Sequence, residues 1–194
     1  GSTLSQTAML QIQSNAVWTK YSQIDITTGN SYFAQLAARN GTVTPRLAQD
    51  AARISIAAAS ELALNATNRF APAAGGRGGQ LDITGTSLLV AAQDLRDSLV
   101  ATGNYGGYLV LDADMISNLG IESVLLGGYR ASTSEGTLIT ATALNLDIAT
   151  DADHALSGPE LLLVSLAPTA ASSNAHGVIV ADGSVITAKG AVAA

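Results

Sequence analysis

One acidic stretch holds the residues of this sequence that are best suited to bind a metal ion. Asp147, Asp151, Asp153 and His154 follow one another closely. Calcium prefers several carboxylate and carbonyl oxygens that are carried by one loop. The stretch lacks the glycine-rich nonapeptide repetition of calcium-binding β-rolls. We therefore interpret it as a solvated acidic loop, and we expect the chain to hold no metal and no cofactor.

A second group of carboxylates, Asp112 and Asp114, has the spacing that general acid–base chemistry could use. The two alternate with Leu111 and Ala113, which predicts a strand with both carboxylates on one face. Glycoside hydrolysis needs two carboxyl groups at a defined separation. Nothing near the pair supplies the aromatic platforms or the Arg and Lys residues of a polysaccharide cleft. We therefore expect that the chain is not an enzyme and has no catalytic residue. The alternative is that it is a carbohydrate-active β-helix enzyme.

The two histidines, His154 and His176, are far apart in the sequence, and each lies in a segment typical of a loop. A catalytic histidine works beside a nucleophile and an orienting carboxylate. No serine motif of the nucleophile-elbow type accompanies either residue. We therefore expect both histidines to be ordinary surface residues rather than catalysts.

Two glycine-rich segments, 75–79 and 103–107, superficially resemble phosphate-binding loops. A phosphate loop needs a defined glycine spacing, a following helix and, in the Walker type, a Lys-Ser or Lys-Thr pair. The first segment is followed instead by a strand-like run, Leu81–Thr84. We interpret both segments as flexible corners at which glycine permits a positive φ.

The main aromatic group lies near the N-terminus and consists of Trp18, Tyr21, Tyr32 and Phe33. Such a group could form a sugar-binding platform or a satellite hydrophobic core. We favour the core, which would cover one end of the rest of the fold.

The composition points to an aliphatic core and away from several function classes. Apolar residues make up 47% of the 194 residues, but aromatic residues only 4% and charged residues only 12%. The net charge is −6, and the 9 Lys and Arg residues are scattered, which argues against a nucleic-acid partner. The chain has no Cys, which excludes disulfides and thiolate metal sites. A cysteine-free chain also suits export in an unfolded state.

Paired aliphatic residues separated by one residue recur along the chain and predict strands with one buried face. In Leu81-Asp82-Ile83, the aspartate is expected to point away from the core and into water. Successive units begin at Ile54, Leu81, Leu109 and Leu138, at nearly equal intervals. These intervals fall in the range of about 20–50 residues that is typical of stacked repeats.

The repeat predicts an all-β protein, a right-handed parallel β-helix. Its turns need short strands, small residues at the corners and loops of variable length, and the sequence offers all three. The segments that hold most of the Gly, Pro and Asn residues are the expected loops, namely 71–79, 94–107, 129–136, 149–159 and 168–177.

The N-terminal third fits the repeat less well. One short helix is expected at Ser31–Arg39, with Ser31 as its N-cap and Asn40-Gly41 as its stop. Pro45–Ala52 is equally compatible with a helical turn or an irregular excursion. Gly1 and Ser2 look like a cloning scar. We expect residues 3–194 to form a single segment, most regular over 43–167, excised from a much longer chain.

The stretch from Pro45 to Ile83 resembles the filamentous haemagglutinin-like large exoproteins of two-partner secretion systems. The residues that carry the resemblance are Pro45-Arg46-Leu47, Asp50-Ala51, Ile54-Ser55-Ile56-Ala57, Leu62-Ala63-Leu64 and the run Gly75–Ile83. It is strongest over about 43–92 and diffuse elsewhere. The resemblance implies a β-helical shaft, export through a partner transporter in the outer membrane, and a role in adhesion, biofilm or toxin display. It offers no catalytic residues.

The expected function is therefore that of a structural and adhesive segment, secreted or held at the bacterial cell surface, that presents loops for attachment. Its expected partners are a ligand on a host cell, a surface or a polysaccharide, and the transporter during export. End-to-end self-association through unpaired strand edges is a further expectation. A passive stalk for delivery of a C-terminal toxin is the remaining alternative.

Overall fold

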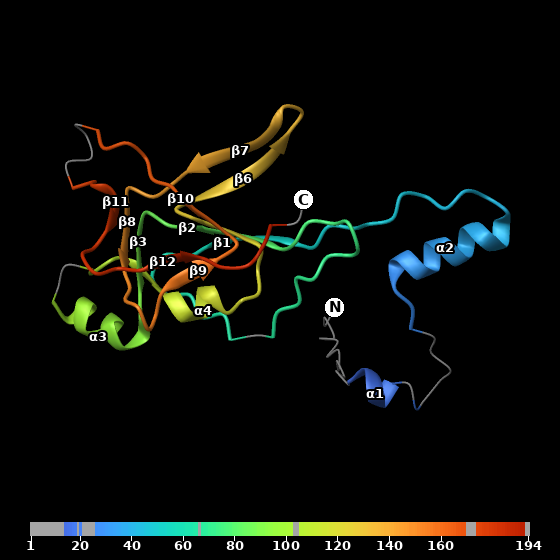
Figure 1. The fold of residues 1–194 in the computed structure, drawn as a ribbon, viewed down its shortest axis with the longest axis horizontal. Coiled ribbons are helices and arrows are strands. Elements are labelled where there is room, and N and C mark those ends of the chain that lie inside the picture. Colours follow the sequence, from blue (N-terminus) through green and yellow to red (C-terminus); the bar gives the residue numbers. More distant parts are fainter. Residues whose placement is uncertain are drawn as a thin grey trace, which may run out of the picture. The chain divides into compact units, whose positions relative to one another are not determined.

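The computed structural model describes residues 14–18, 20, 26–65, 67–102, 105–169 and 174–192. The chain divides into two compact units, Gly1–Leu47 and Ala48–Ala194 (Figure 1). The expected cloning scar at Gly1 and Ser2 lies outside the described residues.

The first unit contains the helices α1 (Asn15–Trp18) and α2 (Gly29–Asn40). The helix expected here is confirmed, but it begins earlier than predicted, because Thr28 rather than Ser31 is its N-cap. The Thr28 hydroxyl accepts a hydrogen bond from the Ser31 backbone N at 3.2 Å. Gly41 ends the helix with a φ of 63°, as a C-cap glycine should. The segment Pro45–Ala52 contains no helical turn.

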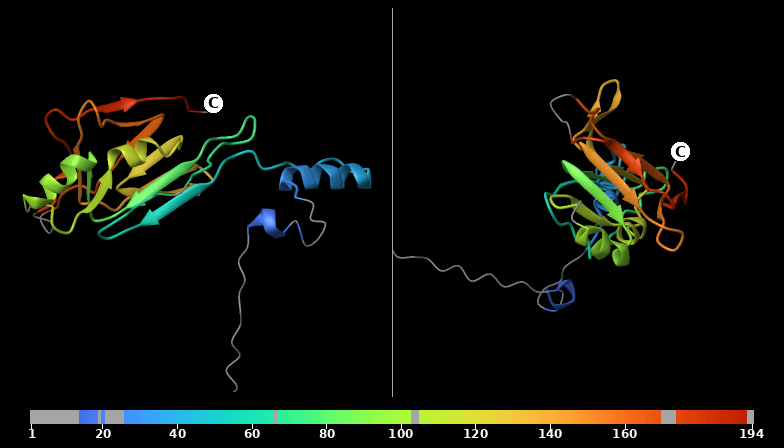
Figure 2. Two further views of the ribbon diagram at one scale, coloured as in Figure 1. Left: turned by 90° about the horizontal axis from the view of Figure 1, so that it is seen from below. Right: turned by 90° about the vertical axis from the view of Figure 1, so that its left-hand side faces the viewer.

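The prediction of an all-β, right-handed parallel β-helix is wrong. The described residues instead form a mixed α/β structure, in which twelve strands make four small sheets and helices lie between them. Some strands are parallel and some antiparallel. Figure 2 shows the strands of the larger sheets side by side, with helices around them.

The first four-stranded sheet has the order β1 (Arg53–Ala57), β2 (Gln80–Thr84), β5 (Ser123–Leu126) and β10 (Glu160–Leu163). All its strand pairs are parallel. Ile54 pairs with Leu81, as the repeat predicts, but the next partner of Leu81 is Val124 rather than Leu109. The expected series of units therefore fails after its second member.

The second four-stranded sheet explains this failure. Its order is β11 (Gly177–Val180), β8 (Asn145–Ala149), β3 (Ser87–Ala91) and β4 (Leu109–Asp112). After β3 the chain forms helix α3 (Gln93–Ala101) and returns as β4 on the side of β3 opposite to β8. Strands therefore do not follow one another across this sheet in chain order, as a simple stack of turns requires.

Two small sheets and a short helix complete the unit. Strands β6 (Gly128–Thr133) and β7 (Gly136–Ala141) form an antiparallel hairpin, which projects from the unit in Figure 1. This hairpin replaces the loop expected at 129–136. Strand β9 (Leu156–Gly158) pairs in parallel with β12 (Ile186–Ala188). Helix α4 (Ala113–Ser117) follows β4 directly.

The core is aliphatic, as the composition predicts. Inward side chains of the two larger sheets are almost completely buried, among them Leu81, Ile83, Leu88, Leu109, Val124, Leu146 and Ile148. Burial of one such side chain stabilises a fold by about 1.5–3 kcal/mol. Among the described helices, none is long and apolar enough to cross a membrane.

The outer face of the first sheet is covered as well, by the hairpin. Asp82 is 0% exposed, so the expectation that it points into water is wrong. Arg130 of β6 reaches this carboxylate, with Nε 2.7 Å from Asp82 Oδ1. The Arg130 guanidinium also donates to Ser123 Oγ at 2.8 Å, and Ser123 Oγ in turn donates to Glu160. The alternating pattern gives the correct face of the strand but not what covers that face.

Candidate functional site

Four polar and aromatic residues from distant parts of the chain line one pocket of about 370 Å³. They are Tyr105, Tyr108, Asp147 and His176. Asp147 lies in the middle of β8, where its neighbours Leu146 and Ile148 point into the core. Strand alternation therefore places the Asp147 carboxylate on the outer face. The two tyrosines follow α3, and His176 directly precedes β11.

His176 is held against Asp147 by the parallel pairing of β11 with β8. His176 Nε2 lies 2.7 Å from Asp147 Oδ1. The His176 backbone N donates to Asn145 Oδ1 at 2.9 Å, and Gly177 pairs with Asn145 in the sheet. A carboxylate only accepts hydrogen bonds, so the ring nitrogen is the donor. The Asp147 side chain is 11% exposed and the His176 side chain 33% exposed, so the pair opens to solvent mainly through the histidine.

The tyrosines are positioned by a tight turn. The Tyr108 backbone N donates to the Tyr105 carbonyl at 3.1 Å, and Gly107 adopts a φ of 86° inside this turn. That conformation favours glycine, which has no Cβ to clash. The turn brings the ring centroids to 5.0 Å with an interplanar angle of 82°, an edge-to-face pair.

The electrostatics of the pocket keep both phenols protonated. Burial raises the pKa of Tyr105 above its ordinary value of 10.0, and the nearby Asp147 charge raises it further. Burial also raises the pKa of Tyr108, and the nearby Asp147 charge raises it further. The pocket therefore combines a carboxylate, two phenols and an imidazole. Such a set can bind the hydroxyl groups and the apolar face of a small polar molecule.

The sequence did not predict this site, although its parts carry recognisable features. His176 was expected to be an ordinary surface residue, yet it forms a pair with Asp147. The segment 103–107 was expected to be a glycine corner, and its described part does form a turn, but that turn carries a tyrosine at each end. A Tyr-Gly-Gly-Tyr turn before an aliphatic strand is the one local pattern that could have indicated an aromatic site.

The acidic stretch does not act as one group of ligands. Asp151 Oδ1 accepts hydrogen bonds from the backbone N of Asp153 at 3.0 Å and of His154 at 2.8 Å, which forms an Asx turn. His154 Nδ1 lies 2.5 Å from Asp114 Oδ2. Asp147 belongs to the pocket instead. Over the residues that the structure describes, no three His, Asp or Glu side chains are grouped to hold a metal ion.

The predicted pairing of Asp112 and Asp114 on one face of a strand is wrong. Asp112 ends β4 and is the N-cap of α4, where its carboxylate accepts from the backbone N of Asp114 and Met115 at 2.8 and 3.1 Å. Asp114 lies in the helix. An Asp that is followed by helix-compatible residues caps a helix well, and this local preference ends the strand.

The glycine-rich segment 75–79 leads into strand β2, as expected, but it is closely packed rather than flexible. Gly76 is buried, and a Cβ there would come within 2.0 Å of the Gln49 carbonyl oxygen. The Arg77 backbone N donates to Asp50 Oδ1 at 2.9 Å, and the Gly78 backbone N donates to Glu122 Oε2 at 3.0 Å. Glycine is required here for close approach of two chain segments.

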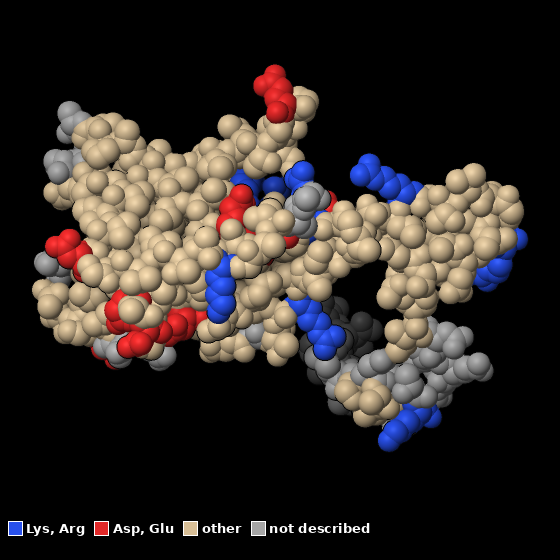
Figure 3. All heavy atoms as spheres, viewed as in Figure 1, with Lys and Arg blue, Asp and Glu red and all other residues tan. Residues whose placement is uncertain are grey.

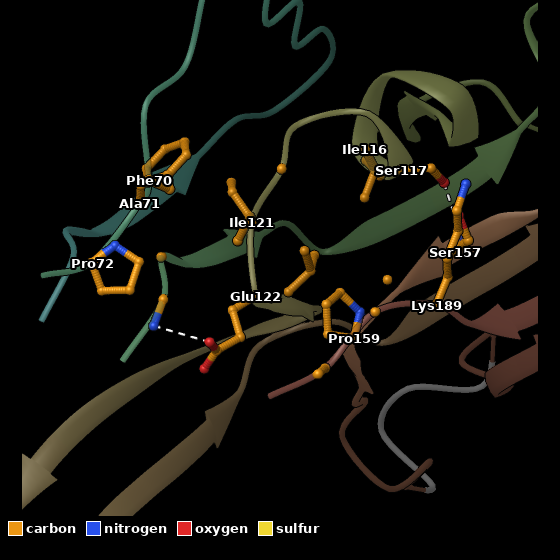
Figure 4. Close-up of a pocket in the computed structure, with 17 residues that line it drawn as sticks. Phe70, Ala71, Pro72, Ile116, Ser117, Ile121, Glu122, Ser157, Pro159 and Lys189 are labelled. Atoms are coloured by element: carbon orange, nitrogen blue, oxygen red, sulfur yellow. Dashed lines mark hydrogen bonds between the residues drawn. The ribbon is translucent and has the colours of Figure 1, made fainter. Parts of the chain in front are cut away.

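This corner borders a second pocket, of about 490 Å³ (Figure 4). Its lining is mainly apolar, with Phe70, Pro72, Ile121 and Pro159 around it. The Glu122 carboxylate at its wall is occupied by the Gly78 amide. Its polar side chains, Ser117, Glu122, Ser157 and Lys189, make up a smaller share of the lining than the polar side chains of the first pocket do, so it is the weaker candidate for a specific ligand.

The aromatic group near the N-terminus is only partly described, because Tyr21 and the side chain of Trp18 lie outside the described residues. Tyr32 and Phe33 form an edge-to-face pair with centroids 5.5 Å apart. They are 46% and 49% exposed, so the expectation that they lie in a satellite core is wrong for these two residues.

Basic side chains lie singly or in small groups on the face that Figure 3 shows, where they form no continuous patch.

Comparison with protein-family models, with curated proteins and with solved structures found no match to this chain.

Proposed function

We propose that this chain is a structural and adhesive segment of a secreted bacterial surface exoprotein, in which packed parallel sheets present a loop-borne pocket for attachment. The observation that carries the proposal is the pocket of Tyr105, Tyr108, Asp147 and His176. Three of these residues lie on loops, and the fourth lies on a central strand. Binding residues are often carried by loops on a rigid scaffold in this way.

The scaffold suits a role in which the pocket is held in a fixed geometry. Its two larger sheets are entirely parallel, and their inward side chains form one aliphatic cluster. The buried Arg130–Asp82 pair ties the hairpin to this scaffold. Rigid positioning of a pocket reduces the ordering cost of ligand binding, which benefits an attachment module.

Export through an outer-membrane partner transporter belongs to the same proposal. The absence of Cys supports it, because a cysteine-free chain cannot form a premature disulfide during passage. Secretion is tested by expressing the chain's parent protein with and without the transporter and assaying the outer surface of the cells.

Attachment is tested with beads that carry the full chain, applied to a panel of epithelial cells, bacterial cells and immobilised polysaccharides. We expect the wild-type beads to be retained on at least one surface and Tyr108→Ala beads to be washed off. Tyr129→Ala is the matched control, because Tyr129 is a 40% exposed tyrosine of the hairpin. Equal retention of all three on every surface contradicts a role for the pocket and favours a passive stalk.

A further inference from the structure

We infer that the pocket of Tyr105, Tyr108, Asp147 and His176 binds one uncharged pyranose ring of a glycan. The inference rests on the proposed attachment function and names the chemical class of its ligand. It is carried by the shape, the aromatic lining, the hydrogen-bonding capacity and the charge of the pocket.

The size of the pocket suits one sugar ring. Its volume of about 370 Å³ lies near the lower end of the range of about 300–1,000 Å³ that is usual for small-molecule sites. It is too small to enclose a long oligosaccharide, but it is partly open to solvent, where a glycan chain could continue.

The aromatic lining suits the apolar face of a pyranose. Both tyrosines are partly exposed, and each contributes to the pocket wall. A tyrosine combines a flat apolar ring with a polar hydroxyl, which matches a sugar ring that has a C–H face and a rim of hydroxyls. Ile179 adds an apolar side chain that is 45% exposed at the same wall.

The carboxylate suits the hydroxyl rim. A carboxylate offers about four acceptor positions. His176 Nε2 uses one of them. The remaining positions of Asp147 can accept hydrogen bonds from ligand hydroxyls, and both phenols can donate hydrogen bonds, because a tyrosine is protonated at neutral pH and burial raises these two pKa values further. The site therefore holds both acceptors and donors for hydroxyl groups.

The charge of the pocket selects against acidic sugars. Asp147 contributes the carboxylate of the lining, and no Lys or Arg is among the described residues that line the pocket. A uronate or sialate carboxylate in the same space would meet like-charge repulsion. A quaternary ammonium ion binds over the open faces of aromatic rings. Here the edge of one tyrosine meets the face of the other, so that the second face is covered. The uncharged ring is thus the ligand that fits best.

The test uses the full chain and saturation-transfer NMR with methyl glycosides of glucose, galactose, mannose and N-acetylglucosamine. Methyl glucuronide and choline serve as the charged probes. We expect transfer to the ring C–H protons of at least one neutral glycoside and none to the charged probes. Transfer to choline alone, to the glucuronide alone or to no probe overturns the inference.

Variants locate the binding. Tyr105→Ala removes a ring from the wall, and Asp147→Asn removes the charge while it keeps the size of the side chain. Each is expected to weaken binding of the neutral glycoside by on the order of tenfold or more. Tyr129→Ala should bind as the wild type does, and unchanged binding by both pocket variants contradicts the inference. Circular dichroism confirms that each variant is folded, and Tyr108→Phe, which keeps the ring, replaces any variant that is not.

The bead assay separates this inference from the proposed function. Retention of beads that depends on Tyr108, together with no binding of any neutral glycoside, leaves the attachment function standing and overturns the sugar assignment. Absence of both retention and glycoside binding overturns the two together.

Discussion

Arg130 and Asp82, which lie on different sheets, form an ion pair that is closed to solvent. Their side chains are 3% and 0% exposed, and the Arg130 backbone N and Nε both donate to the Asp82 carboxylate, at 2.8 and 2.7 Å. A pair of this kind fixes how two elements pack, because either partner alone would leave a buried, uncompensated charge. It therefore determines where the hairpin β6–β7 lies on the first sheet.

The first prediction concerns this ion pair. Arg130→Met should lower the free energy of unfolding by about 3–5 kcal/mol, because Asp82 remains buried without its partner. The matched control is Arg96→Met, which breaks an exposed pair with Asp97 at 3.7 Å and should cost less than about 1 kcal/mol. Urea unfolding measures both. The double variant Asp82→Leu/Arg130→Met should recover part of the loss, because it removes the buried charge but also the acceptor of the Arg130 backbone N. Equal destabilisation by the two single variants would show that the pair is not closed to solvent.

The second prediction concerns Gly127, between β5 and β6. Its φ is 92°, and a Cβ there would lie 2.1 Å from the Val164 carbonyl oxygen. Gly127→Ala should therefore destabilise the fold by at least about 1–3 kcal/mol, because both the backbone of Gly127 and the segment that follows β10 must shift. Gly106→Ala is the control, since a Cβ there meets nothing within 4 Å. A thermal melt that moves equally for both variants contradicts this packing.

The third prediction concerns alkaline pH. Because burial and Asp147 hold the pKa of Tyr105 and Tyr108 above 10.0, the folded chain keeps these protons at pH values where the unfolded chain loses them. Their contribution to stability is fully present below pH 10 and is lost as the pH rises from about 10 through the raised folded-state pKa. Phenolate absorbance should show late-titrating tyrosines that disappear in the double variant Tyr105→Phe/Tyr108→Phe. Asp147→Asn should move their titration only part of the way back, because burial is the larger cause. If every tyrosine of the chain instead titrated together at the ordinary pKa of tyrosine, the placement of Tyr105 and Tyr108 beside Asp147 would be refuted.

The fourth prediction concerns self-association through strand edges, which we propose as a property of the assembled protein. Strand β11 is an end strand of its sheet, and Val178, Ile179 and Val180 are 38%, 45% and 49% exposed. An exposed apolar edge of this kind is a template for pairing with another chain. Sedimentation velocity should show concentration-dependent association of the wild type and a monomer for Val180→Lys. Val192→Lys changes a residue that is 50% exposed and outside the strands, and it should leave association unchanged. Association that survives Val180→Lys would assign it to another surface.

The aliphatic pattern predicted much of the local structure and little of the topology. Ile54 and Leu81 are register partners, as their spacing indicates. Leu109 is instead the partner of Leu88, and Leu138 lies in the hairpin, 55% exposed. A period of alternating side chains identifies strands and buried faces, but it contains no information about which strand lies next to which. The return of the chain through α3 decides that order.

The candidate site escaped prediction for a related reason. Tyr108, Asp147 and His176 come from three separate segments, and only the parallel pairing of β11 with β8 brings His176 to Asp147. Each residue alone has an ordinary local explanation. The burial of Asp82 could not be predicted either, because the hairpin that buries it lies in a later part of the chain. Local sequence reveals the polar side chain, and tertiary packing decides whether it faces water or a partner.

The most direct test of the account is an amide chemical-shift titration of the isotope-labelled full chain with the panel of neutral methyl glycosides. The account predicts that the largest shifts occur at Tyr108, Asp147 and Gly177, around the pocket that Tyr105 and His176 complete. Shifts that cluster instead at Gly78, Glu122 and Gly190, around the larger apolar pocket, would contradict it, as would a titration in which no amide moves.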